Sequence, residues 1–368
     1  MRIMVVARAI DRIAGGVEHM ASLLMNEMTA RGHKVELMSW DLAGASSFFA
    51  LAPGIIWHKL DRGDPHNKAG LRLMGGRAGA IRRIMRASRP DVIIAFQHGP
   101  FISTRFYCAG LDLPIIAAER EAPTRFEHLK AGKWRRMIFH SFRLAQKVTV
   151  QLESYRSIYP SYLHDRIIAI PNPVPPALNR ADPDRAINGR FQLLSIGRLA
   201  YQKNFGALID AFASVAASAP DWDLVIVGEG EERNRLDELI RQRRLTDRIS
   251  LPGNSRDVAA YYRSSHAFCL PARWEGFPNA LAEALAHGLP SIGFAGCSGV
   301  NELIRHGENG LLAGGNGDTR TLAEAIAGVT ANAAIRRRMG DAAPESVTCY
   351  APSGIFDRWE RLLREAVS

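Results

Sequence analysis

The clearest chemical pattern in the sequence lies between Leu270 and Pro290, where two carboxylates flank a short loop and the start of a helix. The first carboxylate, Glu275, stands in the loop after an apolar strand, and Glu283 follows it on the helix. Between them lies the loop sequence Gly276, Phe277, Pro278 and Asn279. Because the free amides and the dipole of a helix start attract an anion, the pattern favours a ligand with both phosphates and hydroxyl groups. Solvated glutamates on an ordinary helix would give the same spacing.

Three other strand ends in the second half of the sequence carry residues of ligand-binding type. The first of these strands is followed by Gly197, Arg198 and, a few residues later, Lys203. Two cations at a strand end can bind both phosphates of a diphosphate. The next two strands end in turns that would let the backbone approach a ligand closely, at Gly228, Gly230 and Gly253. Four successive strand ends of this kind are a stronger signal than any one of them.

The first half of the sequence offers two further candidates. Gly15 and Gly16 precede a helix and would let a ligand approach the helix start, although a plain tight turn needs the same residues. They are not part of a G-x-G-x-x-G pattern, so a dinucleotide cofactor is not indicated. His98 follows the apolar strand 91–96, where it could contact a donor sugar or an acceptor, or be structural.

Strand-like and helical segments alternate through nearly the whole chain, which predicts parallel sheets covered by helices on both faces. Strands are expected at 2–7, 34–39, 91–96, 114–118, 147–150, 167–170, 191–197, 223–228, 248–251, 266–270, 291–294 and 310–313. Helices are expected at 17–31, 69–88, 124–145, 205–217, 230–243, 256–264, 279–287 and 320–328. The chain therefore belongs to the α/β class, with two doubly wound domains.

Residues 171–190 contain five prolines and no apolar period, which predicts a linker between the domains. The expected organisation is a first domain at 1–172, a linker at 173–190, a second domain at 191–349 and an amphipathic helix at 350–368. Ligands of open α/β sheets bind beyond the carboxyl ends of the strands, so a cleft between the two domains is the expected site.

On these residues the chain resembles glycosyltransferase family 4, whose members are retaining enzymes of the GT-B architecture. The resemblance rests on Gly15 to Glu18, on Gly197 to Leu199 with Lys203 and Asn204, on Glu275 to Glu283, and on the linker start at Pro171 to Val174. It covers nearly the whole chain and is most specific over 191–312. One departure is Ala272 to Trp274, where the family often has a loop containing serine.

The resemblance implies two Rossmann-like domains that face a central cleft, with a C-terminal helix that crosses back to the first domain. The second domain would bind a nucleotide-sugar donor and the first an acceptor. Arg198 and Lys203 would neutralise the diphosphate leaving group without a metal or any other cofactor. Glu283 would bind the ribose, Glu275 a hydroxyl of the transferred sugar, and the amides of Gly276 to Asn279 the sugar and its phosphate. Gly16 would add its amide from across the cleft, and the departing phosphate would take the acceptor proton.

Basic charge is concentrated in the first half of the chain, and this distribution indicates the class of partner that the protein binds. Residues 1–175 contain 25 Lys and Arg against 14 Asp and Glu, whereas residues 176–368 contain 22 against 23. The excess lies mainly at 72–89 and 120–147. Since no nucleic-acid-binding motif accompanies it, the expected partner is an anionic membrane surface rather than nucleic acid. Solvated helix faces would give the same composition.

No apolar run is long enough to span a bilayer, and the start of the sequence predicts a strand rather than a signal peptide. A cytoplasmic protein, peripheral on the inner face of the cytoplasmic membrane, is therefore expected. Its acceptor would be a lipid-linked saccharide or another glycan of the bacterial surface. The donor is expected to be a UDP-sugar first and GDP-mannose second.

Three alternatives remain at this point: a nucleotide-sugar epimerase of the same architecture, a Rossmann oxidoreductase, and a basic nucleic-acid-binding protein. No metal site is expected, because the four cysteines are scattered and lack a C-x2-C spacing. The sequence from Asp221 to Asp223 resembles the manganese-binding D-x-D of another transferase architecture. It precedes a strand instead of following one, so it predicts a turn at the opposite edge of the sheet.

Overall fold

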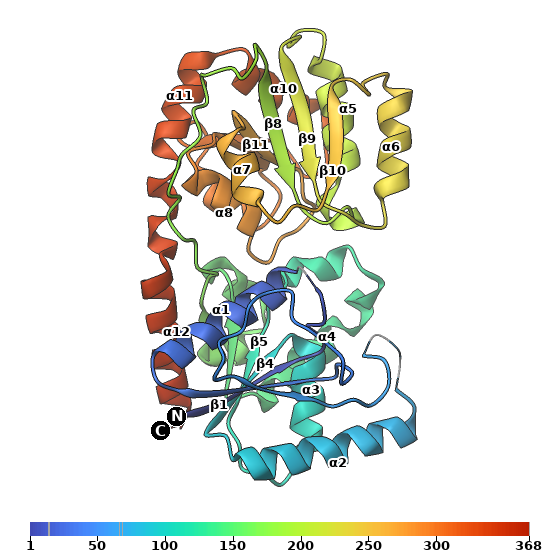
Figure 1. Cartoon of the computed structure of the whole chain (residues 1–368), viewed down its shortest axis with the longest axis vertical. Coiled ribbons are helices and arrows are strands. Elements are labelled where there is room, and N and C mark those ends of the chain that lie inside the picture. The colour runs from blue at the N-terminus through green and yellow to red at the C-terminus, as the bar shows by residue number, and fades with distance from the viewer. Residues whose placement is uncertain (14, 66, 68, 368) are drawn as a thin grey trace. The chain divides into compact units, whose positions relative to one another are not determined.

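The computed structural model describes residues 1–13, 15–65, 67 and 69–367. The chain forms two compact units: one comprises Met1–Asn172 with Ser353–Ser368, and the other Pro173–Pro352. Each unit contains one parallel sheet with helices on both sides (Figure 1). The predicted architecture of two doubly wound α/β units is therefore confirmed.

The sheet of the first unit has seven strands in the order β3-β2-β1-β4-β5-β6-β7. They are β1 (Arg2–Ala7), β2 (Lys34–Ser39), β3 (Ile56–Lys59), β4 (Val92–Phe96), β5 (Ile115–Ala118), β6 (Lys147–Val150) and β7 (Ile167–Ala169). The strand order reverses between β1 and β4. Because crossovers between parallel strands are right-handed, such a reversal places successive helices on opposite faces of the sheet. The central strands are apolar and buried, as sheets covered on both faces require.

The longer helices of the first unit are α1 (Gly16–Ala30), α2 (Leu71–Ser88), α3 (His98–Tyr107), α4 (Arg135–Ser141) and α12 (Pro352–Val367). Short 3-10 helices are η1 (Pro123–Glu127), η2 (Lys130–Trp134), η3 (Phe142–Leu144), η4 (Glu153–Ile158) and η5 (Ser161–Arg166).

The prediction of one helix over 124–145 is wrong, because this segment is divided into η1, η2, α4 and η3. The backbone of Leu129 is extended, with φ −114° and ψ 146°, and interrupts the helical run. The chain folds back there, so that Phe126 packs edge-on against Phe139 with ring centroids 5.6 Å apart. A side chain at Gly132 would collide with the carbonyl oxygen of Phe126. Burial of the two aromatic rings therefore outweighs the local helical preference.

The last helix, α12, belongs to the first unit, as predicted. Its apolar face joins the core formed by β1, α1 and β4, and Trp359 is completely buried there. On its polar face, Arg31, the residue that follows α1, pairs with Asp357 at 2.7 Å and with Glu360 at 2.9 Å. The helix is thus fixed by apolar burial and by a cluster of ion pairs.

The sheet of the second unit has six strands in the order β10-β9-β8-β11-β12-β13. They are β8 (Phe191–Ile196), β9 (Trp222–Val227), β10 (Ile249–Gly253), β11 (Ala267–Leu270), β12 (Ser291–Phe294) and β13 (Gly310–Ala313). The helices are η6 (Tyr201–Lys203), α5 (Phe205–Val215), α6 (Arg233–Gln242), α7 (Val258–Arg263), α8 (Asn279–Ala286), α9 (Val300–Leu303), α10 (Thr319–Thr330), α11 (Ala333–Ala342) and η7 (Glu345–Tyr350).

The proline-rich segment 173–190 forms no helix or strand, but it belongs to the second unit. The amide of Ala181 donates to the carbonyl of His287 at 2.8 Å, and the Arg336 guanidinium donates to the carbonyl of Pro183 at 2.8 Å. Asp184 pairs with Arg337 at 2.5 Å. The segment is therefore held on the surface of that unit and is not a free tether.

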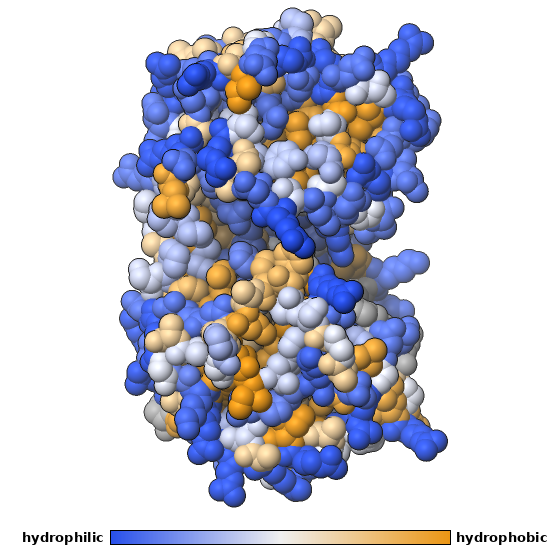
Figure 2. Space-filling view, in the orientation of Figure 1, coloured by the Kyte–Doolittle hydropathy of each residue, from blue (hydrophilic) through white to orange (hydrophobic). Residues whose placement is uncertain are grey.

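Exposed hydrophobic residues lie among hydrophilic ones on the face seen in Figure 2. Within the described part of the chain, no helix is both long and apolar enough to cross a membrane.

Candidate functional site

The predicted donor residues lie at the point where the strand order of the second unit reverses. This reversal occurs between β8 and β11, and the chain leaves the carboxyl ends of these two strands in the loops 197–204 and 271–278. Two neighbouring strands whose connections depart to opposite faces leave a crevice at that edge, which is where open α/β sheets bind ligands. Arg198, Lys203 and Glu275 all lie on these two loops.

Lys203 and Glu275 form an ion pair, with Nζ and Oε1 2.6 Å apart. Both side chains are shielded from solvent, with exposed fractions of 18% and 7%. Glu275 follows β11 and Lys203 ends η6, so the pair joins the two loops of the crevice. A lysine ammonium has three N–H donors, and this contact uses one of them. Lys203 can therefore hold Glu275 and still donate to an anionic ligand.

Arg198 differs from Lys203, although both were expected to bind the diphosphate. Its side chain is exposed, and within the described residues it makes no ion pair or side-chain hydrogen bond. The stem of Lys203 packs against Gly197, where a Cβ would come within 3.0 Å of the lysine Cε. Gly197 thus leaves space for the positioned cation, while Arg198 is free to reorient toward a ligand.

Arg273 is a site residue that the sequence pattern marked only as a departure from the family. Its guanidinium donates to Asn204 Oδ1 at 2.7 Å and lies 4.5 Å from the ring centroid of Tyr201. Its backbone amide donates to the carbonyl of Gln202 at 2.9 Å. These contacts fasten the turn that carries Lys203 to the loop that carries Glu275. No sequence motif signals them, because the partners are about 70 residues apart.

The start of α8 lies directly after the Glu275 loop. The helix begins at Asn279, the residue at which the sequence predicts it. Within the described part of the chain, the amides of Ala280 and Leu281 have no backbone acceptor. Two unpaired donors and the positive end of the helix dipole therefore face the same loop. This arrangement suits a phosphate or a sugar oxygen.

Glu283 lies one turn further along α8 and is partly buried. The hydroxyl of Tyr262 lies 3.1 Å from its Oε2 and 3.0 Å from the carbonyl oxygen of Ala280. Burial of the carboxyl raises the pKa of Glu283 to about 7, and the hydrogen bond from Tyr262 opposes part of that rise. Any ligand that donates hydrogen bonds to the ionised Glu283 carboxylate would therefore stabilise that charged form. Tyr262 was not foreseen.

The glycines after β9 are explained by packing between neighbouring turns. Gly228 has φ 147°, and a side chain on it would collide with the carbonyl oxygen of Gly197. A side chain at Gly230 would likewise collide with the carbonyl oxygen of Leu199. Gly253 ends β10 with φ 85°, beside the carboxylate of Glu229. The expected reason for these glycines was close approach to a ligand, whereas the contacts found are between protein atoms.

The first unit has its own reversal of strand order, between β1 and β4. Gly15 precedes α1, which begins at Gly16, and Gly16 is exposed. The carboxylate of Glu18 lies over Gly15, and burial raises its pKa. The start of α1 is therefore covered in part by an acidic side chain of the same helix.

His98 follows β4 closely and is the first residue of α3. Its Nε2 lies 2.8 Å from the hydroxyl oxygen of Ser141, and that hydroxyl donates to the carbonyl of Ile138 at 2.7 Å. Since the serine proton is used by Ile138, the Nε2 of His98 must be the donor, which leaves Nδ1 as an acceptor. Burial lowers the pKa of His98, so the ring is neutral near pH 7.

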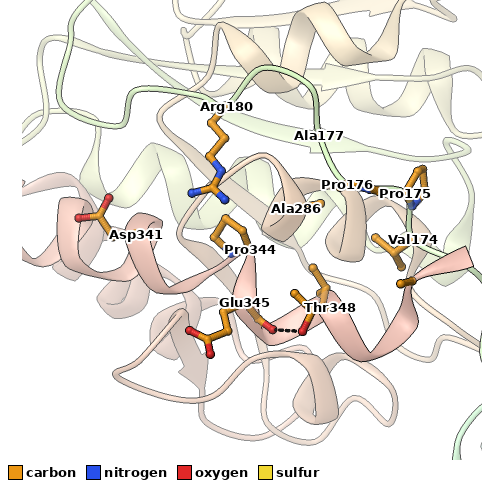
Figure 3. A pocket seen from close by; sticks show the side chains of 12 residues that line it. Val174, Pro175, Pro176, Ala177, Arg180, Ala286, Asp341, Pro344, Glu345 and Thr348 are labelled. Carbon is orange, nitrogen blue, oxygen red and sulfur yellow. Dashed lines mark hydrogen bonds between the residues drawn. The ribbon is translucent and has the colours of Figure 1, made fainter. Parts of the chain in front are cut away.

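Neither a metal cluster nor the cavity shown in Figure 3 marks the site. Among the described residues, no three His, Cys, Asp or Glu side chains are placed to hold a metal ion. Asp223, which belongs to the D-x-D sequence at the start of β9, pairs with Arg190 at 2.5 Å and with Arg248 at 3.1 Å. The cavity in Figure 3 lies beside Ala286, at the end of α8 opposite to the Glu275 loop, and is lined by Pro175, Pro176, Arg180, Asp341, Pro344 and Glu345 among others.

Two family models match the chain. The model "Glycosyl transferases group 1" matches residues 180–346, and "Glycosyltransferase Family 4" matches residues 14–178. The first model lies within the second structural unit, the other covers most of the first unit and ends at residue 178, and together they span most of the chain.

The amylovoran biosynthesis glycosyltransferase AmsD of Erwinia amylovora is 30% identical over 234 residues, covering 62% of this chain and 65% of that protein. A second relative, from Campylobacter jejuni, is 25% identical over 287 residues, or 78% of each protein. Its name describes an alpha-1,4-N-acetyl-D-galactosaminyltransferase for a glycan carried on PP-undecaprenol. The chain thus spans 65% of the length of AmsD, and it spans only 21% and 48% of the length of two other matching relatives.

Among solved structures, Anabaena Alr3699/HepE in complex with UDP and glucose superimposes with a TM-score of 0.80, 17% identity and 99% coverage of each chain. At this identity the likeness concerns the fold. None of these relatives is an epimerase, so nothing supports that alternative. The matched family models, the glycosyltransferase relatives and the paired doubly wound units show that the chain belongs to the family 4 glycosyltransferases of the GT-B fold.

Proposed function

We propose that this protein is a retaining, metal-independent glycosyltransferase. It would transfer a hexose-type sugar from a nucleotide sugar to a lipid-linked or polysaccharide acceptor in bacterial surface glycan synthesis. The observation that carries the proposal is the site at the strand reversal of the second unit, where the Lys203–Glu275 pair lies beside the start of α8. It combines a positioned cation, free amides and two carboxylates, which match the groups of a nucleotide sugar.

In this proposal each residue of the crevice has one role. Lys203 and Arg198 bind the diphosphate and stabilise the negative charge that develops on it as it leaves. Glu283 accepts hydrogen bonds from the ribose hydroxyls, and Glu275 from a hydroxyl of the transferred sugar. The amides at the start of α8 bind the phosphate or the sugar nearest to it.

The reaction would proceed without a protein base. The acceptor oxygen forms a bond to the anomeric carbon, the bond from that carbon to the phosphate oxygen breaks, and the phosphate takes the acceptor proton. Atoms and charge balance in this step, and the new bond forms on the face that the phosphate leaves. In the first unit, the neutral His98 with its accepting Nδ1 suits a sugar hydroxyl.

A UDP-sugar is the first choice of donor and GDP-mannose the second. Support for UDP comes from solved relatives that were crystallised with UDP and a sugar. Support for a lipid-linked acceptor comes from the Campylobacter relative, whose named substrate is carried on PP-undecaprenol. A peripheral location at the cytoplasmic face of the membrane would give access to such an acceptor.

Replacing Lys203 tests the assignment of the crevice. Lys203→Gln keeps a hydrogen-bond donor for Glu275 but removes the charge, so UDP-glucose should bind roughly 10- to 100-fold more weakly, with a smaller loss of stability than an alanine at this position causes. Lys203→Ala should weaken binding by a similar factor. It should also destabilise the second unit, because the buried Glu275 carboxylate loses its ion pair. Calorimetric titration and thermal unfolding measure the two effects.

The matched control is Arg320→Ala, which removes one exposed cation from α10 in the same unit. Its affinity for UDP-glucose should stay within about twofold of the wild type. If both Lys203 variants bound UDP-glucose and GDP-mannose as tightly as the wild type, the crevice would not be the donor site.

The raised pKa of Glu283 predicts that donor binding depends on pH. Ribose hydroxyls favour the ionised carboxylate, so affinity for UDP-glucose should rise from pH 6 to pH 8, with uptake of the donor accompanied by proton release. The diphosphate of a nucleotide sugar has no pKa in this range, which makes it a better probe than free UDP. Calorimetric titrations in buffers of different ionisation enthalpy measure the number of protons that are released when the donor binds.

Glu283→Gln should remove this pH dependence and weaken binding at pH 8. Because burial raises the carboxyl pKa above its usual value of 4.5, wild-type stability should fall as the pH rises from about 4.5 to 7. The glutamine variant should escape this loss and be more stable at pH 8 by about 1–3 kcal/mol. An affinity for UDP-glucose that is independent of pH in the wild type would exclude Glu283 from the ribose site.

Metal independence is tested by chelation. Because Lys203 and Arg198 would supply the positive charge for the leaving diphosphate, sugar transfer should continue at an unchanged rate in excess EDTA. A loss of transfer that is restored only by Mn²⁺ or Mg²⁺ would contradict the proposed mechanism.

A further inference from the structure

One segment of the first unit carries a concentration of unpaired positive charge. Residues 128–152 contain no Asp or Glu and six basic residues: Lys130, Lys133, Arg135, Arg136, Arg143 and Lys147. Arg125 and Arg156, just outside the segment, each make an ion pair with a nearby glutamate. Within the described residues, none of the six basic side chains does so. No acidic side chain neutralises these charges, so they can attract an external anion, although Arg135 and Lys147 each donate to a backbone carbonyl.

Large apolar side chains are exposed among these cations. Trp134 is 51% exposed and Met137 60% exposed, and Leu129, Leu144 and Tyr162 are exposed by similar amounts. The Lys133 ammonium lies 5.6 Å from the Trp134 ring, and the Arg143 guanidinium 5.7 Å from the Tyr162 ring. Exposed Trp and Tyr beside Lys and Arg are typical of surfaces at the membrane interface.

A cavity of about 540 Å³ opens within this surface. It is lined by Arg135, Arg136, Phe139, His140, Ile158, Tyr159, Pro160 and Tyr162. The Arg135 guanidinium is already engaged, since it donates to the carbonyl of Ile158 at 3.3 Å and lies 5.2 Å from the Phe139 ring. Arg136 and His140 are exposed and have no hydrogen-bond partner among the described residues. The cavity therefore combines free nitrogen donors with an apolar wall.

We propose that this surface docks the first unit on an anionic membrane and that the cavity binds the phosphate group of a membrane lipid. Arg136 and His140 donate to the phosphate oxygens, while Trp134 and Met137 insert among the acyl chains beside it. Docking is independent of the reaction. The docking proposal rests on the proposed function in one respect only, which is that a lipid of this kind also carries the acceptor.

The magnitudes are sufficient for reversible docking. A Lys or Arg near an anionic bilayer contributes about 1 kcal/mol, so six unpaired cations and two inserted side chains give binding that is strong at low salt. Because the charges are exposed, salt should weaken the binding steeply, and the apolar side chains should account for what remains at high salt.

Vesicle sedimentation with the full-length protein tests the proposal. Vesicles of phosphatidylcholine alone are compared with vesicles that also contain phosphatidylglycerol or phosphatidic acid, adjusted to equal surface charge. The wild type should not bind the neutral vesicles and should bind both anionic kinds. It should prefer vesicles with phosphatidic acid, because the phosphate of that lipid is accessible as a monoester. Failure to bind either anionic vesicle at low salt would overturn the proposal.

Two variants and one control separate the cavity from general charge. Arg136→Ala with His140→Ala should abolish the preference for phosphatidic acid, and Trp134→Ala with Met137→Ala should remove the binding that persists at high salt. Arg83→Ala with Arg86→Ala takes two exposed cations from α2 of the same unit and should change vesicle binding by less than about twofold. An equal loss in this control and in the cavity variant would contradict a specific phosphate site.

Three more measurements separate lipid docking from the binding of soluble phosphates, nucleic acid or the sugar donor. If the cavity variant lost affinity for inorganic pyrophosphate but kept its preference among vesicles, the cavity would bind soluble phosphates and not lipid. Binding to a DNA duplex without binding to vesicles would show a nucleic-acid surface. UDP-glucose binding should be unchanged in the cavity variant. Vesicle binding by a wild type that binds no nucleotide sugar would refute the proposed function and leave the docking surface intact.

Discussion

The ion pair between Lys203 and Glu275 is the interaction on which the candidate site depends. It joins the loops that leave β8 and β11, which are neighbouring strands at the reversal of the sheet. Gly197 is small because the lysine stem occupies the space of its side chain. Arg273 holds the lysine turn from the glutamate side through Asn204. Removing either charge would break the ion pair that joins the two loops, so the two loops and the site between them depend on each other.

The same topology organises both halves of the chain, but it presents different chemistry in each. In the second unit the reversal carries cations, free amides and carboxylates that match a nucleotide sugar. In the first unit it carries a neutral histidine and a glycine helix start that is partly covered by Glu18. The basic surface of the first unit lies on other elements, chiefly η2 and α4. We infer that donor recognition and membrane docking are assigned to separate surfaces.

The fold could be predicted from the sequence because buried parallel strands leave short apolar runs that local composition reveals. The predicted start of α8 at Asn279 also coincides with the observed one. The four-residue strand β3 escaped prediction, since Ile56 is exposed and the strand lies at the sheet edge. The helix expected over 124–145 failed because contact between Phe126 and Phe139 folds the segment back. The sequence predicted which types of residue form the site. It did not predict that Arg273 and Tyr262 contact them, because such contacts are formed only by the folded chain.

Hydrogen–deuterium exchange of the full-length protein, with and without saturating UDP-glucose or GDP-mannose, tests the central claim most directly. The crevice contains the exchanging amides that a donor would cover, including those of Ala280 and Leu281 at the start of α8. Our account predicts slower exchange in peptides that span 197–204 and 275–283, and unchanged exchange in α10 and around the cavity of Figure 3. Protection confined to that cavity, or no protection in either crevice loop with both nucleotide sugars, would contradict it.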